Sequence, residues 1–150
     1  MDLYKFHSNP ETLHGYDRAD EIVPERIYNI AKSGKKLTNE QEDIIAKNSE
    51  YAYYYALNVL KKPFPKGEDA IAKDPQYAYY YAIDILKKHF PKGEDTIAKD
   101  LKYAYLYARD ILKKPWPKGE DVISKDSQWA YEYARYVLKL PEVEAKKWPK

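Results

Sequence analysis

A repeat of 26 residues constrains the fold of this chain more than any other feature. Phe64 opens the word Phe-Pro-Lys-Gly-Glu-Asp, which returns at Phe90 and, with tryptophan in first place, at Trp116. The same interval before Phe64 leads to Thr38, where the Pro-Lys-Gly part is absent but later residues of the unit are kept. A fixed period of this length is typical of proteins whose units stack on one another. The chain divides into four units, at 38–63, 64–89, 90–115 and 116–141, between terminal segments at 1–37 and 142–150.

Each unit carries signals for two helices. Asp74 is a favourable N-cap, Pro75 suits the first helical position, and no Gly or Pro interrupts residues 76–88, so a long helix is predicted there. A short helix is predicted before it, from about Gly67 to Lys73, with two acids in its first turn. Two helices joined by tight turns in every period predict an all-α fold. We expect a solenoid of short α-hairpins, with 1–37 and 142–150 as its N-terminal and C-terminal caps.

Tyrosine is unusually common, with 17 copies against 3 of phenylalanine. On a helical wheel, Ala52 and Ala56 lie at the centre of an apolar stripe and Tyr53 and Tyr55 at its flanks, and this frame recurs in every unit. We expect the alanines to let neighbouring helices approach closely, and the tyrosine rings to cover the contact with hydroxyls that still reach water. At the end of the chain, Trp148 is expected to fold back on the last hairpin.

The repeated residues also carry a resemblance. They read aromatic-Pro-x-Gly-Glu, Ile-Ala-Lys-Asp, Tyr-Ala-Tyr-x-Tyr-Ala and Leu-Lys in order along a unit. This pattern resembles a tandem helical-hairpin repeat of uncharacterised proteins from bacteriophages and some bacteria, and the resemblance covers 38–141 fully and 1–37 weakly. It implies a phage-like setting, in which small cytoplasmic proteins act on host processes or defence systems. It implies no activity and no catalytic residue.

The sequence offers little for catalysis or metal binding. It has no cysteine, and His7, His14 and His89 do not have metal-ligand spacing with another donor. Acid pairs such as Glu68 and Asp69 are explained by their place in the first turn of a helix. Each glycine of the repeat stands alone rather than in a phosphate-binding loop. We therefore predict a protein that is not an enzyme and uses no metal or cofactor.

The net charge and the hydropathy of the chain limit the classes of partner that it is expected to bind. Lys+Arg 26 against Asp+Glu 24 gives a net charge of +2, and arginine is rare, so nucleic acid is an unfavoured partner. No segment approaches the roughly 18 apolar residues of a membrane span, and no secretory signal opens the chain, so a cytoplasmic location without membrane contact is expected. The lysine pairs that follow the long helices should line one edge of the stack. We expect the acids that begin the next short helix to neutralise them.

The units differ from one another at those positions of the long helix that face away from the predicted core. These positions change from aromatic and aliphatic in the first two units to charged in the last two, and an exposed apolar patch normally marks a contact. The candidate partner-binding or ligand-binding residues are Tyr54, Leu57, Tyr80, Ile83, Arg109, Arg135 and Tyr136. Segment 1–37 lying across the patch is one alternative. Self-association and a separate partner or ligand are the others.

Three functions fit these features. The first is a non-enzymatic binding protein that contacts a host protein or its own copy, because tyrosine and arginine are favoured interface residues. The second is a sponge for a nucleotide-derived small molecule, with tyrosines stacking on the base and Arg or Lys on phosphate. The third and weakest is single-stranded nucleic-acid binding, which must fall steeply with salt.

Overall fold

The computed structural model describes residues 16–150, and all regular structure in that range is helical, as predicted. The first helix, α1 (Tyr16–Lys32), precedes the repeat, and α10 (Glu142–Ala145) follows it. The short helices of the units are α2 (Asn39–Ala46), α4 (Glu68–Ile71) after the 3-10 turn η4 (Pro65–Gly67), α6 (Pro91–Ile97) and α8 (Pro117–Ile123). The long helices are α3 (Ser49–Tyr54) with η3 (Tyr55–Leu60), α5 (Pro75–Tyr80) with η5 (Tyr81–Leu86), α7 (Leu101–Tyr107) with η6 (Ala108–Leu112), and α9 (Ser127–Tyr136).

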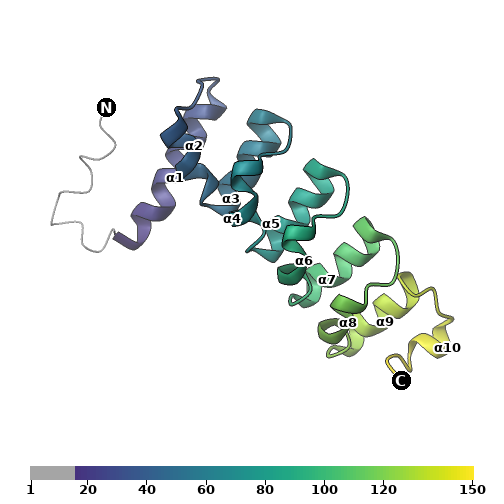
Figure 1. Cartoon of the computed structure of the whole chain (residues 1–150). Coiled ribbons are helices and arrows are strands. Elements are labelled where there is room, and N and C mark those ends of the chain that lie inside the picture. Colours follow the sequence, from purple (N-terminus) through teal and green to yellow (C-terminus); the bar gives the residue numbers. More distant parts are fainter. Residues whose placement is uncertain (1–15) are drawn as a thin grey trace.

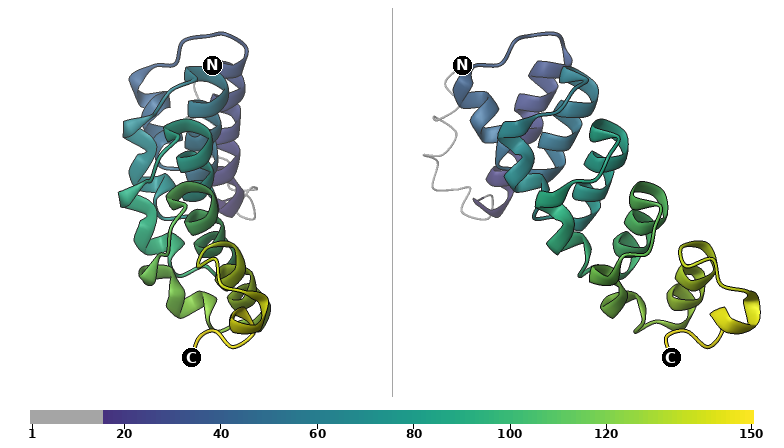
Figure 2. Two further views of the ribbon diagram at one scale, coloured as in Figure 1. Left: turned by 90° about the vertical axis from the view of Figure 1, so that its right-hand side faces the viewer. Right: turned by 45° about the vertical axis from the view of Figure 1, so that its right-hand side comes forward.

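The helix pairs stack into an elongated staircase (Figure 1). The long helices lie side by side in one layer and the short helices in another, and both layers run the length of the molecule (Figure 2). Each long helix contacts the long helix of the next unit and packs closely on that unit's short helix. The stack therefore grows by one unit at a time, and neighbours along the sequence are neighbours in space.

The predicted caps of the long helices are present. The Asp74 carboxylate accepts hydrogen bonds from the backbone N–H groups of Gln76 and Tyr77, at 2.9 and 3.1 Å, and Asn48, Asp100 and Asp126 act in the same way. The short helix predicted from about Gly67 to Lys73 is α4, which begins at Glu68 after the 3-10 turn η4. In the next two units the α-helix begins earlier, at proline, two residues before the glycine. Proline is favoured there because its missing N–H would have no partner in the first turn.

Close packing between units depends on paired small residues. A Cβ atom added to Gly93 would lie 2.9 Å from the Cβ of Ala78 and 2.8 Å from the Phe90 ring. Gly67 has the same relation to Ala52, at 2.8 Å. The glycine of each repeated word therefore lets its short helix approach the alanine seam of the preceding long helix, as the wheel predicted for the alanines.

A buried tyrosine holds each unit to the next. Tyr107 has no exposed surface, and its hydroxyl donates to Glu94 Oε1 at 2.8 Å and accepts from the backbone N–H of Phe90 at 2.7 Å. Its ring contacts the Trp116 ring of the next unit, with centroids 5.1 Å apart. Tyr81 and Tyr133 make the same two hydrogen bonds. The expectation that these hydroxyls reach water was wrong, because the short helix of the same unit covers them and supplies their partners.

The two ends of the stack are closed differently. Trp148 folds back on the last hairpin, as predicted, and its ring centroid lies 5.2 Å from that of Tyr133, where another unit would place its own aromatic residue. At the other end, α1 packs on α2, α3 and η3. The Tyr28 hydroxyl accepts a hydrogen bond from Asn58 at 2.8 Å. Both caps thus imitate a missing neighbour.

The long helices end in an unusual way. Their last turn is π-helical in η3, η5 and η6, and the residue that follows is a lysine in the left-handed region. In unit 4 the left-handed lysine comes three residues after the end of α9. These residues are Lys61, Lys87, Lys113 and Lys139, with φ between 53° and 61°. Glycine is the usual residue in this conformation. The chain therefore turns before it reaches the proline that follows the lysines.

Candidate binding site

A row of packed tyrosines forms a surface on the layer of long helices. Its middle members are partly exposed (Tyr51, Tyr54, Tyr77 and Tyr80), and Tyr28 and Tyr103 at its two ends are buried. We call this surface the tyrosine face and define it as Tyr28, Tyr51, Tyr54, Tyr77, Tyr80 and Tyr103. Their rings contact one another directly or through Tyr53 and Tyr79, with centroids 5.2 to 6.5 Å apart. The row crosses from α1 to α7, so it spans the N-terminal cap and the first three units.

Four of the predicted site residues lie on or beside this face, but none of the four is exposed. Tyr54, Leu57, Tyr80 and Ile83 are partly buried and pack against the core. The wheel treats a single helix and does not include the rings of the next unit, which cover part of this surface. From the cap, Tyr28 contacts Tyr54 at 6.1 Å between centroids, whereas residues 1–15 of the segment predicted to lie across the patch are outside the described residues.

A second set of tyrosines links the long helices through acids. The Tyr53 hydroxyl donates to Asp84 at 2.7 Å, and the Tyr79 hydroxyl donates to Asp110 at 2.8 Å. Each bond joins one unit to the next across the same step of the repeat. Desolvation and these carboxylates raise the pKa of Tyr53 and of Tyr79, so both hydroxyls remain donors.

This link is replaced at the junction of units 3 and 4. One repeat after Asp110 stands Tyr136, which has no carboxylate to offer Tyr105. Arg109 instead lies over the Tyr105 ring, 5.1 Å from its centroid, and makes two hydrogen bonds to Asp110 at 2.6 and 3.0 Å. Partial burial alone would raise the pKa of Asp110, but the hydrogen bonds from Arg109 and Tyr79 hold it below its ordinary value.

A hollow of about 360 Å³ opens at this junction. We call it the junction pocket; its lining is Ala108, Arg109, Lys113, Tyr136, Val137 and Lys139. Two predicted site residues, Arg109 and Tyr136, therefore meet here, whereas Arg135 donates to the backbone carbonyl of Leu140 at 2.8 Å and holds the chain after α9. Comparison of the four units in sequence singles out Tyr136. It does not single out Lys113 and Lys139, because an equivalent lysine occurs in every unit.

The lysines that follow the long helices are not neutralised as expected. They are Lys61, Lys62, Lys87, Lys88, Lys113, Lys114 and Lys139, which we call the lysine edge, and all are exposed. In the part of the chain that the structure describes, no salt bridge involves them. The acids pair instead with the lysine of the next repeated word: Asp43 with Lys66 at 3.0 Å, and Glu68 with Lys92 at 3.5 Å. The loops that carry the lysine edge lie in a row along one side of the staircase (Figure 1).

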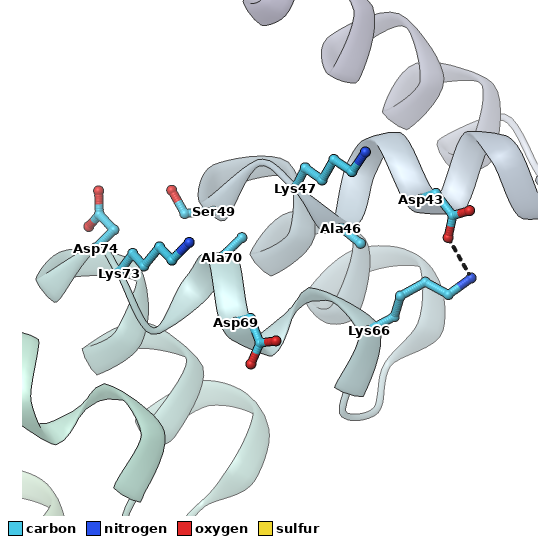
Figure 3. Close-up of a pocket in the computed structure, with 9 residues that line it drawn as sticks. All are labelled: Asp43, Ala46, Lys47, Ser49, Lys66, Asp69, Ala70, Lys73 and Asp74. Carbon is cyan, nitrogen blue, oxygen red and sulfur yellow. Dashed lines mark ion pairs between the residues drawn. The ribbon is translucent and has the colours of Figure 1, made fainter.

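A larger hollow, of about 680 Å³, lies between the short helices of the first two units. Figure 3 shows that lysines and aspartates share its rim and that Asp43 and Lys66 reach toward each other across it. Asp74 there is already engaged as the cap of α5. Because its charges balance and its ion pair recurs between later units, we interpret this hollow as part of the repeat's own packing.

Comparisons with known proteins found no match, whether to a family model, a curated protein or a solved structure. The resemblance to phage repeat proteins therefore stays a prediction. Within residues 16–150, no group of His, Cys, Asp or Glu could hold a metal ion. In the same range, no helix is long and apolar enough to cross a membrane.

Proposed function

We propose that this chain is a non-enzymatic helical-repeat binding protein, and that its tyrosine face contacts a protein partner. The observation that carries the proposal is the unbroken row of mutually packed tyrosines across three units, of which Tyr51, Tyr54, Tyr77 and Tyr80 are partly exposed. Tyrosine is a preferred anchor of protein interfaces. Here the rings already hold one another in place, so binding a partner would cost little of the side-chain entropy of these tyrosines.

The lysine edge supports a partner with an acidic rim. The seven lysines of the lysine edge are exposed and form no ion pair with any residue that the structure describes, and they run along the same layer of helices as the tyrosine face. Charges at the rim of an interface mainly raise the association rate, and salt screens them. We therefore expect the association rate to fall as salt rises, with a smaller change in the dissociation rate.

The resemblance to phage repeat proteins favours a host protein, including one of a defence system, as this partner. A second copy of the chain is the alternative occupant of the same face. Sedimentation velocity of the purified chain separates the two. A concentration-independent monomer supports a different protein, whereas a dimer that Tyr54→Ala/Tyr80→Ala dissociates supports self-association.

The host-protein proposal is tested with a photo-crosslinking residue at Leu57, which borders the tyrosine face, and at Asp121, which is exposed on the short helix α8. We expect a host protein to be captured from living cells at Leu57 and not at Asp121. The purified pair is then measured by calorimetry with Tyr54→Ala/Tyr80→Ala and with Tyr136→Ala as the control. At least tenfold weaker binding is expected for the double variant alone. Equal affinities for all three chains contradict the tyrosine face.

A further inference from the structure

The junction pocket is the place where the repeat departs from its own pattern. At the two preceding junctions a tyrosine hydroxyl and an aspartate close the space between neighbouring long helices. At the junction of units 3 and 4 the aspartate is replaced by Tyr136, and the hollow of about 360 Å³ lies beside it. This volume falls within the range of small-molecule sites. A substitution that removes a packing bond and leaves a hollow points to a ligand rather than to the stability of the stack.

The positively charged side chains of the pocket favour an anionic ligand. Arg109, Lys113 and Lys139 line it together. Asp110 is the acid next to Arg109, and it is already engaged by Arg109 and by the Tyr79 hydroxyl. Lys113 and Lys139 have no salt bridge in the described part of the chain, and both occupy left-handed backbone. Non-glycine residues held in that conformation are concentrated at functional sites.

An exposed aromatic ring completes the pocket. Tyr136 is 52% exposed, and within residues 23–150 the one other large hydrophobic residue so exposed is Val143. Ala108 and Val137 add apolar surface beside the ring. Planar ligand rings stack on tyrosine, while phosphate oxygens bind Arg and Lys. The pocket thus presents separate partners for a base and for phosphate.

We propose that the junction pocket binds a nucleoside phosphate, with its base against Tyr136 and its phosphates on Arg109, Lys113 and Lys139. The lining of the hollow comes from units 3 and 4 alone, which favours a small molecule over a polymer that would follow the whole lysine edge. This site is distinct from the tyrosine face and does not depend on the proposed protein partner. Loss of one activity therefore leaves the other to be measured.

The repeat supplies matched variants for the test. Lys113→Gly/Lys139→Gly removes two charges from the pocket, and Lys61→Gly/Lys87→Gly removes two charges from the same backbone conformation elsewhere. Glycine favours that conformation, so both chains should fold. Tyr136→Asp restores the residue that the preceding units carry and should close the pocket by accepting from Tyr105.

Binding of ATP, adenosine and tripolyphosphate is measured by isothermal calorimetry at fixed salt on the full chain. We expect ATP to bind, Lys113→Gly/Lys139→Gly and Tyr136→Asp to weaken it at least tenfold, and Lys61→Gly/Lys87→Gly to change it less than twofold. Equal weakening by the two lysine pairs means general charge attraction and overturns the proposal. Tripolyphosphate binding as tightly as ATP overturns recognition of the base, and no ATP binding at millimolar concentration overturns the site itself.

Discussion

The buried hydroxyl of Tyr107 and its equivalents joins three parts of the fold. It donates to the partly buried Glu94 and accepts from the Phe90 N–H in a buried hydrogen bond, while the ring fills the space between units. A buried polar group left unpaired is destabilising by about 1–3 kcal/mol. Tyrosine is therefore used in place of phenylalanine because its oxygen, as well as its ring, has a structural role.

Tyr107→Phe tests this role. We expect the free energy of unfolding to fall by about 1–3 kcal/mol, because the Phe90 N–H and Glu94 lose their partner while the ring is kept. Urea denaturation followed by circular dichroism measures the change. Tyr136→Phe removes an exposed hydroxyl and should alter stability by less than about 0.5 kcal/mol. Equal effects from the two variants would contradict the structural role of the buried hydroxyl.

The raised pKa of these buried hydroxyls predicts that the fold loses stability at alkaline pH. Burial, together with the hydrogen bond to Glu42, raises the pKa of Tyr55 from 10.0 to about 12. The unfolded chain releases the proton first, so this stabilisation is complete below pH 10 and is lost as the pH rises toward 12. Each such tyrosine lowers the free energy of unfolding by about 1.4 kcal/mol per pH unit in that window. Tyrosinate absorbance and helical circular dichroism should change together above pH 10; tyrosinate forming fully in a chain that stays helical would oppose this account.

At the scale of the helix, the left-handed lysines are the least expected feature. A non-glycine residue in this region is destabilising by about 1–3 kcal/mol, and each of the four units has one such lysine. The exposed side chain gains no salt bridge in the described structure in return. A glycine at these positions would relieve the strain but would remove the charge that the lysine places on the exposed edge.

Lys87→Gly should therefore stabilise the chain. We expect a gain of roughly 0.5–1 kcal/mol, because relief of the left-handed strain exceeds the greater freedom of glycine in the unfolded state. The midpoint of urea denaturation measures it. Lys88→Gly removes the same charge from a residue with negative φ and is expected to be neutral or destabilising. A gain from Lys88→Gly as large as that from Lys87→Gly would attribute the effect to charge instead.

Sequence patterns predicted most of the elements and less of the sites. The period, the Asp74 cap and the seam around Ala52 follow from local signals that each unit repeats. The predicted exposure of Tyr80 and the predicted pairing of the lysine edge with acids were wrong, because both depend on side chains from adjacent units. The junction pocket is visible in sequence only as Tyr136 in a column of polar residues, with no sign that Lys113 and Lys139 lie beside it.

The whole molecule is a one-dimensional stack whose ends require protection. Trp148 takes the place of a following unit against Tyr133. In such a stack, stability is close to a sum of units and their shared interfaces. Loss of the final interface should therefore weaken unit 4 first and leave distant units unchanged.

Trp148→Ala tests this prediction by hydrogen exchange with mass spectrometry. We expect faster exchange in peptides from 116–141 and no change in those from 64–89, since only the last interface is lost. Val143→Ala alters an exposed residue of the same segment and should leave both regions unchanged. Uniformly faster exchange along the chain would indicate a single cooperative unit and contradict the additive stack.

The tyrosine that links successive units also determines how such a chain can gain or lose a unit. Each of these tyrosines takes both hydrogen-bond partners from its own unit and its ring contact from the next, so copying residues 64–89 in tandem recreates these contacts on both sides of the insert. An insert of another size would break them. Gene duplication can thus lengthen this rod in fixed steps, and each added copy moves the N-terminal cap one step further from the cationic hollow.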